Sequence, residues 1–140
     1  MALTLRPFRP ADREACVRIF RQAQPLAYPR QARTAPPRED FDTVTRDEDI
    51  WVIEENDAIA GFVSIYRPDG FVHHLYVDPS RHRRGIGRAL LEAALRRCGG
   101  HADLKCNEAN RAAQGFYLAA GFRPVEWGWA ASGPWIRYRF

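Results

Sequence analysis

The sequence has almost no lysine, few cysteines and no long hydrophobic run. Of its 140 residues 21 are basic, and Lys105 is the single lysine among them. No apolar run approaches the roughly 18 residues that a membrane span requires. The charged N-terminal stretch lacks the apolar centre of a secretory signal. We therefore expect a cytoplasmic protein with no membrane partner.

The three cysteines, Cys16, Cys98 and Cys106, are an odd number without the spacing of metal ligands. This pattern favours free thiols in a reducing compartment and predicts no metal site. Internal repeats and low-complexity segments are also missing. A chain of this length and composition, 46% hydrophobic and 27% charged, is typical of one globular domain covering residues 1–140.

Basic charge is concentrated in the stretch "VDPSRHRRGIGRALLEAALRR", residues 77–97. It contains six arginines against Asp78 and Glu92, a surplus equal to the net charge of the whole chain, +4. Like charges repel, so stability alone does not favour this crowding. A local basic cluster indicates a compact anionic ligand, whereas a nucleic-acid binder would spread its charge along a longer track. We expect no nucleic-acid partner.

The coarse pattern of the chain is that of a mixed α/β domain. Strands are expected over 3–8, 50–55, 58–67, 70–78 and 102–106, with a closing antiparallel pair over 123–129 and 135–140. Asn56-Asp57 marks a hairpin turn. Helices are expected over 13–23, where Asp12 is a good N-cap, and after the arginine cluster and residue 106. The prolines after residue 24 predict a loop. The strand–helix–strand unit 70–106 implies a parallel strand pair.

A turn that contains Gly85 and Gly87 leads from the arginine cluster into the next helix, and it has the chemistry of a phosphate site. A helix N-terminus presents unpaired amides and a partial positive charge, and glycines let the backbone approach an anion. Gly85 and Gly87 lie in this turn, and Arg83, Arg84 and Arg88 can add contacts to phosphate oxygens. The spacing fits neither a P-loop nor a Rossmann fingerprint. We interpret the turn as a pyrophosphate site.

Two segments resemble the GCN5-related N-acetyltransferase (GNAT) superfamily. "VDPSRHRRGIGRALL" is similar to its acetyl-CoA-binding segment, Gln/Arg-x-x-Gly-x-Gly/Ala after a strand ending in Val-x-Pro. "NEANRAAQGFYLAAGF" resembles the family's Asn-x-x-Ala-x-x-Phe-Tyr-x-x-x-Gly-Phe helix. His82 stands where the pattern has Gln or Arg, and the neighbouring arginines can take over that polar contact.

The resemblance implies a mixed central sheet of six to seven strands with flanking helices and a splayed parallel pair in its middle. It implies that acetyl-CoA lies in the gap, with the Val77 N–H polarising the thioester carbonyl. The cofactor-binding residues that it predicts are Leu75, Tyr76, Val77, His82, Arg83, Arg84, Gly85, Ile86, Gly87, Arg88, Asn110 and Phe116. The activity implied is direct acetyl transfer to a primary amine in a ternary complex, without a metal.

Catalysis needs an acid for the leaving thiolate and a base for the amine. Tyr117 matches the family's tyrosine acid. For the base we favour His73, which matches one of two strand histidines in the serotonin N-acetyltransferase branch; an imidazole pKa near about 6.5 suits the task. Strand alternation predicts that His73 and His74 lie on opposite faces, with His73 on the face of Leu75 and Val77. His74, or a water relayed to Glu54 or Glu55, remains an alternative.

The acceptor is expected between the loop 24–37 and the C-terminal hairpin. Its candidate walls are Tyr28, Trp51, Trp127, Trp129 and Trp135. The sequence does not choose among amine acceptors, nor between a monomer and a homodimer. A non-catalytic acyl-CoA sensor of the same fold is the alternative function.

Overall fold

The computed structural model describes residues 3–27, 40–82 and 85–140. Its elements in chain order are β1 (Leu3–Pro7), the 3-10 turn η1 (Pro10–Asp12), α1 (Arg13–Ala27), α2 (Phe41–Val44), β2 (Asp49–Glu55), β3 (Ala58–Tyr66), η2 (Arg67–Asp69), β4 (Phe71–Val77), η3 (Pro79–Arg81), α3 (Ile86–Arg97), β5 (Asp103–Asn107), α4 (Arg111–Ala119), β6 (Arg123–Ala130) and β7 (Gly133–Arg139).

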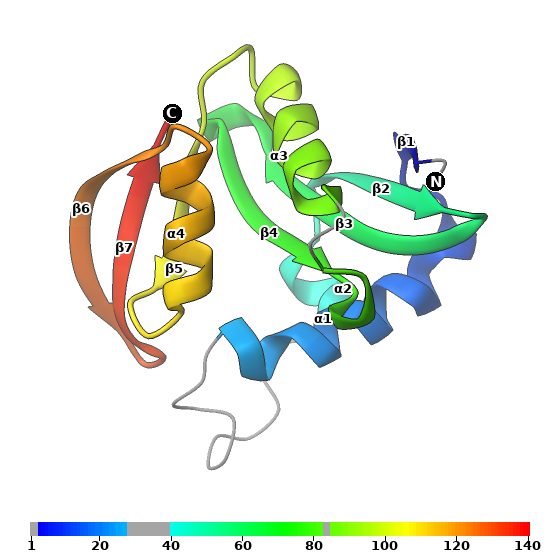
Figure 1. Cartoon of the computed structure of the whole chain (residues 1–140), viewed down its shortest axis with the longest axis horizontal. Coiled ribbons are helices and arrows are strands. Elements are labelled where there is room, and N and C mark those ends of the chain that lie inside the picture. The colour runs from blue at the N-terminus through cyan, green and yellow to red at the C-terminus, as the bar shows by residue number, and fades with distance from the viewer. Residues whose placement is uncertain (1–2, 28–39, 83–84) are drawn as a thin grey trace.

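The strands form one mixed sheet in the order β1-β2-β3-β4-β5-β7-β6. All neighbours are antiparallel except β4 and β5, which are parallel. Their pairing is limited to Phe71 with Asp103 and Val72 with Leu104, so the two strands part after these residues. Figure 1 shows the resulting gap in the ribbon between β4 and β5. The predicted splayed pair in a mixed sheet of six to seven strands is confirmed.

Helices cover both faces of this sheet. On one face α3 and α4 pack over a cluster that includes Ile86, Leu90, Tyr117 and Phe122. On the other face α1 and α2 enclose a smaller cluster with Phe20, Phe41 and Phe62 at its centre. Alternate residues of β3, such as Phe62 and Val63, enter the two clusters in turn, as a strand buried on both faces requires.

Local sequence signals fix several of the boundaries. Asn56 and Asp57 have φ of 52° and 66°, which is the left-handed pair that a tight hairpin between β2 and β3 needs. Gly100 ends α3 by donating to the Leu95 carbonyl at 2.8 Å. The predicted hairpin and this helix end are confirmed.

Two local expectations about α1 are wrong. The helix continues past residue 24 and includes Pro25 in its last turn; a proline so close to the end forfeits little of the helix ladder. Asp12 does not cap α1, because its carboxylate accepts from the Arg9 N–H at 2.8 Å and pairs with Arg6. The carboxylate instead closes the preceding turn η1 through the Arg9 N–H and holds Arg6 of β1.

Candidate active site

The N-terminus of α3 is open in the way an anion site requires. Gly85 is the N-cap residue, with φ of 77°, and no side chain caps the helix. The helix ladder begins with Ala89 N–H to the Gly85 carbonyl at 3.1 Å, so the amides of Ile86, Gly87 and Arg88 have no partner within the helix. Within the part of the chain that the structure describes, a Cβ on Gly85 would meet no atom within 4 Å apart from its chain neighbours. Among residues 3–27, 40–82 and 85–140, the turn therefore has space beside three amides that have no partner within the helix.

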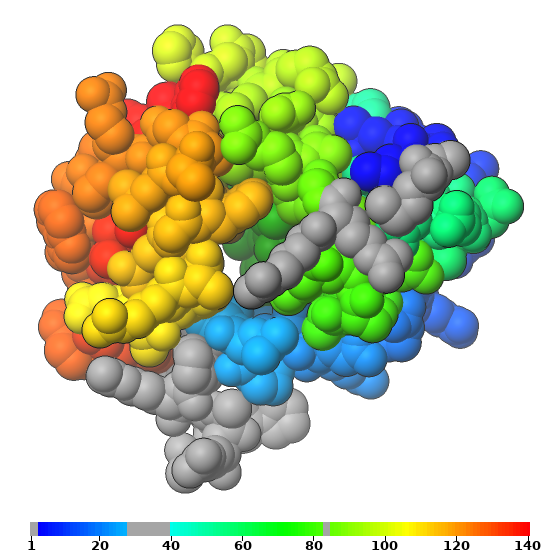
Figure 2. Space-filling view, in the orientation of Figure 1, coloured from blue at the N-terminus to red at the C-terminus, as the bar shows by residue number. Residues whose placement is uncertain are grey.

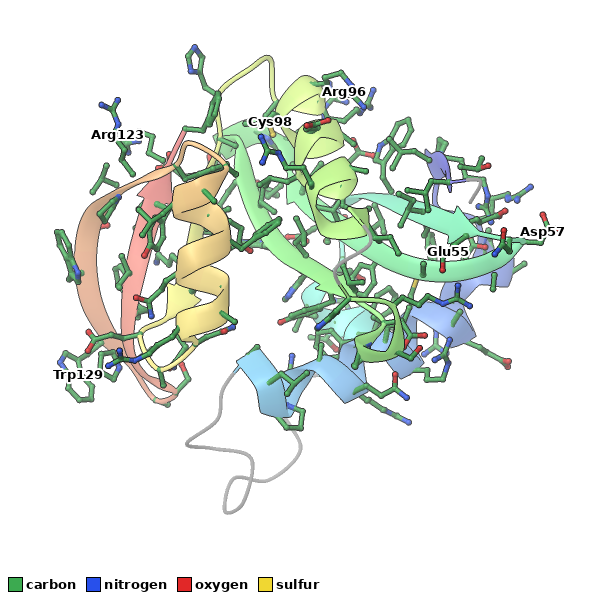
Figure 3. The ribbon with its side chains drawn as sticks, viewed as in Figure 1. Glu55, Asp57, Arg96, Cys98, Arg123 and Trp129 are labelled. Atoms are coloured by element: carbon green, nitrogen blue, oxygen red, sulfur yellow. The ribbon has the colours of Figure 1, made fainter. Side chains whose placement is uncertain are left out.

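The arginines of the cluster separate into different roles. Arg83 and Arg84 lie outside the described residues. Arg88 is half-exposed and pairs with Glu92 at 3.4 Å. Arg81 turns inward, and its Nη1 lies 2.5 Å from a carboxylate oxygen of the fully buried Glu55. Figure 3 labels Glu55 at the end of β2. Part of the crowding of positive charge is thus explained by a buried carboxylate.

Residue His82 ends the 3-10 turn η3 in an extended conformation, and it is exposed. The family pattern has Gln or Arg at this position. An exposed imidazole beside the start of α3 is placed to contact an anion held there, although its contact stays a prediction.

The free edge of β4 faces the gap. Asp78 N–H donates to the Ala60 carbonyl at 2.8 Å, so the amide of Asp78 points toward β3. Backbone groups alternate in direction along a strand, and the amide of Tyr76 therefore also points toward β3. The amides and carbonyls of Leu75 and Val77 point the other way, toward β5, which has already parted. Of the three predicted strand contacts, Leu75 and Val77 have this orientation.

Helix α4 closes the gap from the other half of the molecule. The Asn110 side chain caps it by accepting from the Ala113 N–H at 3.1 Å. Phe116 reaches across to α3, since a Cβ on Gly87 would lie 3.4 Å from the end of its ring. A Cβ at position 87 would only touch Phe116 and Val77, whereas a bulky side chain would press on both. Figure 2 shows the surface hollowed between the half that contains α4 and β5 and the half that contains β4.

Tyr117 is buried in the cluster beneath α3 and α4. Its ring contacts those of Phe116, Phe122 and Tyr138, with centroids 5.3 to 6.0 Å apart. Tyr117 is therefore packed as a core aromatic residue, with its ring held by three neighbouring rings. The predicted catalytic tyrosine therefore lies on the α3–α4 face of the sheet.

The predicted placement of the two histidines is wrong. The β3–β4 register slips between Ser64 and Ile65, which leaves His73 as an extra residue, a β-bulge. The bulge reverses the alternation, so His73 and His74 lie on the same face, with ring centroids 6.0 Å apart. His74 packs against Phe20 of α1. Both histidines therefore lie on the α1–α2 face, opposite to Leu75 and Val77.

Glu48 is the site residue that sequence reasoning missed. It follows α2, and its side chain is only 3% exposed. One carboxylate oxygen accepts from the Ser64 hydroxyl and the other contacts His73 Nδ1. The weak sequence signal for it is a glutamate directly before a strand, which fits an exposed turn residue as well. Glu48 and His73 are 25 positions apart in the sequence, and only the fold brings them together.

The other candidate bases are placed less well. Burial lowers the pKa of His74 to about 4, so this imidazole is a poor proton acceptor at neutral pH. Glu54 is held by Arg6 at 2.6 Å, and Glu55 is held by Arg81. Both carboxylates therefore already neutralise arginines. His73, whose side chain is 43% exposed, is the accessible candidate.

The aromatic residues expected around the acceptor are spread over the molecule. Trp51 packs on the α3 side, with Arg97 5.2 Å above its ring. Trp127 and Trp129 are 62% and 78% exposed on the edge strand β6, and Figure 3 shows Trp129 pointing away from the body. Trp135 lies under Lys105, on the face opposite to Ile136 and hence on the face of His73. Tyr28 lies outside the described residues.

The cysteines and the possible metal ligands give no sign of a second reactive site in the described residues. The cysteines are free thiols, and burial raises the pKa of Cys106, on β5, to about 12. Among residues 3–27, 40–82 and 85–140, no three His, Cys, Asp or Glu side chains gather as a metal site would require. No helix in the same ranges is long and apolar enough to cross a membrane.

Comparison with known sequences points to one family. The pattern of the acetyltransferase (GNAT) family matches residues 13–122. A stretch of 79 residues is 39% identical to the peptidyl-lysine N-acetyltransferase YiaC of Escherichia coli. This stretch is 56% of the chain and 53% of that protein, so the match spans about half the length of the curated relative.

Solved structures share the fold over the whole chain. YjaB of Escherichia coli in its apo form has a TM-score of 0.78 at 22% identity, covering 100% of this chain and 98% of that one. YncA of Salmonella typhimurium with acetyl-CoA has a TM-score of 0.73 at 20% identity, covering 100% of this chain and 94% of that one. PaiA of Thermoplasma acidophilum in complex with coenzyme A has a TM-score of 0.75 at 15% identity, covering 100% of each chain.

Proposed function

The chain belongs to the acetyltransferase (GNAT) family, and we propose that it transfers an acetyl group from acetyl-CoA to a primary amine by direct transfer in a ternary complex. The observation that carries this proposal is the free edge of β4, which leads from the uncapped start of α3 to the bulge at His73. It supports an extended arm, with a pyrophosphate at one end and a thioester at the other.

The donor end of this proposal rests on matched polar groups. The amides of Ile86, Gly87 and Arg88 bind the pyrophosphate, and Arg83, Arg84 and His82 add polar contacts. Leu75 and Val77 hydrogen-bond the pantetheine arm as a neighbouring strand would, and Asn110 and Phe116 line the arm from α4. The thioester lies at the far end of the arm, so the Leu75 N–H is nearer to it than the Val77 N–H that the resemblance suggested. We assign the polarising contact to Leu75.

The acceptor end lies on the other face of the sheet. His73 takes a proton from the amine there, while Tyr117, on the α3–α4 face, donates a proton to the leaving thiolate. The separation suits a direct transfer, because donor and acceptor approach the gap from opposite faces. Cys106 stays a protonated thiol at neutral pH and does not compete as a nucleophile.

The acceptor is a primary amine of a small molecule or of a peptide. The relative YiaC is named as a peptidyl-lysine N-acetyltransferase, which makes the side-chain amine of a lysine peptide the first acceptor to try. Trp135 and Lys105 border the face where such a chain would enter.

The test is release of free thiol from acetyl-CoA over a panel of primary amines, including a lysine peptide. We expect turnover on at least one amine, with the product heavier by one acetyl group in mass spectrometry. Tight acetyl-CoA binding with no turnover on any amine would instead support the sensor function.

A further inference from the structure

Among the residues that the structure describes, Glu48 is a buried carboxylate that pairs with no arginine or lysine. Its side chain is 3% exposed, and among the described residues its ion-pair partner is His73, with Ser64 as its hydroxyl donor. Other buried carboxylates of this chain, such as Glu55 and Asp103, are paired with arginines. A buried anion is costly unless it is paired and fully hydrogen-bonded. Stability alone therefore does not explain this residue at this position.

The turn that presents Glu48 is tightly defined. Thr45 binds the Phe41 carbonyl through its hydroxyl at 2.7 Å, and the Glu48 N–H donates to the Thr45 carbonyl at 3.1 Å. Asp47 adopts φ of 64°, a left-handed conformation that is uncommon outside glycine. The carboxylate is thus held by backbone bonds on one side and by the Ser64 hydroxyl on the other.

The bulge on β4 supplies the other half of the arrangement. It turns His73 toward Glu48 and stacks it near the rings of Phe71, at 4.9 Å, and Tyr66, at 6.3 Å. With Nδ1 engaged by the carboxylate, Nε2 is the ring atom with no hydrogen-bond partner within residues 3–27, 40–82 and 85–140. His74, the other titratable neighbour, has a pKa lowered to about 4 by burial and brings no charge at neutral pH.

We propose that Glu48 is a positioning residue for acetyl transfer: it holds His73 Nδ1–H so that Nε2 takes the proton of an alkylammonium acceptor. The negative charge also stabilises the imidazolium that forms. This inference rests on the proposed function and narrows it to amines that arrive protonated.

The proton balance of the step is as follows. The ammonium R–NH3⁺ gives one proton to His73 Nε2, and the neutral amine attacks the thioester carbonyl carbon. As the C–S bond breaks, the thiolate takes a proton from Tyr117. The new amide nitrogen loses its second proton, which restores the phenol, and His73 releases its own proton to solvent. The sum is one amide, one free thiol and one proton.

The test uses two amines of similar size, ethylamine and 2,2,2-trifluoroethylamine, of which the first is protonated and the second neutral at pH 7.5. For Glu48→Gln we expect kcat with ethylamine to fall about 10²-fold, the lower range for general-base catalysis. With trifluoroethylamine, the kcat of the variant should stay within about threefold of the wild-type kcat, because that amine needs no base before attack. The KM for acetyl-CoA should not change. Glu126→Gln, an exposed carboxylate on β6, is the control and should behave as wild type.

Equal losses on both amines would overturn the role of Glu48 and leave the proposed function standing, whereas no wild-type turnover on either amine would overturn both. A second measurement uses the wild-type protein and therefore does not depend on whether a variant folds. The imidazole ¹⁵N shifts of His73 should report the Nδ1–H tautomer, and the Nε2–H tautomer would contradict the proposal.

Discussion

In the proposed mechanism, individual residues divide the chemistry between the two faces of the sheet. His73 faces Glu48 on the α1–α2 side, and Tyr117 is packed among aromatic rings on the α3–α4 side. An acid and a base on opposite sides of a gap can act on two substrates that enter from opposite directions. Each residue can then be tested without disturbing the binding of the other substrate.

For Tyr117 we expect that the Phe substitution lowers kcat about 10²-fold, because the thiolate loses its proton donor. The ring contacts with Phe116, Phe122 and Tyr138 need no hydroxyl, so the packing should survive. Steady-state kinetics and calorimetric titration with acetyl-CoA check this. Normal turnover by the variant would assign the acid to another group.

His74 predicts a pH dependence of folding stability. Burial lowers its folded pKa to about 4 from about 6.5, so between these values the unfolded chain binds a proton that the folded chain does not. The free energy of unfolding should therefore fall as the pH drops from about 6.5 to 4, by up to about 1.4 kcal/mol per pH unit. Urea unfolding across this range measures the slope.

His74→Leu should flatten that slope, while the matched control His101→Gln, which removes an exposed histidine, should leave it unchanged. Glu48, His73 and Tyr76 are titratable neighbours of His74, and they are the same in both variants. A slope that persists in His74→Leu would show that another group carries the effect.

At the scale of elements, the two ends of α3 offer a matched pair of glycines. Gly85 and Gly99 have φ of 77° and 76°, and apart from chain neighbours a Cβ on either would meet no described residue within 4 Å. Alanine at either position should cost a similar 1–2 kcal/mol or so of backbone strain. Only at Gly85 would the methyl group occupy the space beside the free amides.

We therefore expect Gly85→Ala to weaken coenzyme A binding at least about tenfold, since each 1.4 kcal/mol is tenfold, and Gly99→Ala to leave it unchanged. Thermal unfolding should show similar losses for both variants. Equal coenzyme A affinity in the two proteins would place the pyrophosphate elsewhere.

The same scale explains what the sequence could and could not predict. The Asn56-Asp57 turn and the glycine end of α3 depend on neighbours in the chain, so local rules identify them. The bulge at His73 does not: alternation assumes a regular strand, and the slip of register is set by pairing with β3. Glu48 reaches the site through a turn whose direction depends on a left-handed Asp47. The sequence shows Arg81 only as one member of the basic cluster, because its partner, Glu55, lies 26 positions away in the chain.

At the scale of the whole molecule, the splayed pair organises everything else. The two halves of the sheet meet through only two residue pairs of β4 and β5, and each half carries its own helices to the edge of the gap. Backbone groups left unpaired inside a protein need partners. In the proposed function, those of Leu75 and Val77 acquire them when an extended ligand lies along β4. We infer that the fold creates its donor site by leaving one ladder unfinished.

Amide hydrogen exchange, measured by NMR with and without coenzyme A, tests this central claim most directly. The account predicts that coenzyme A slows exchange at Leu75, Val77, Ile86, Gly87 and Arg88, while the exposed strand β6 is unaffected. Unchanged exchange at these amides in the presence of saturating coenzyme A would contradict it.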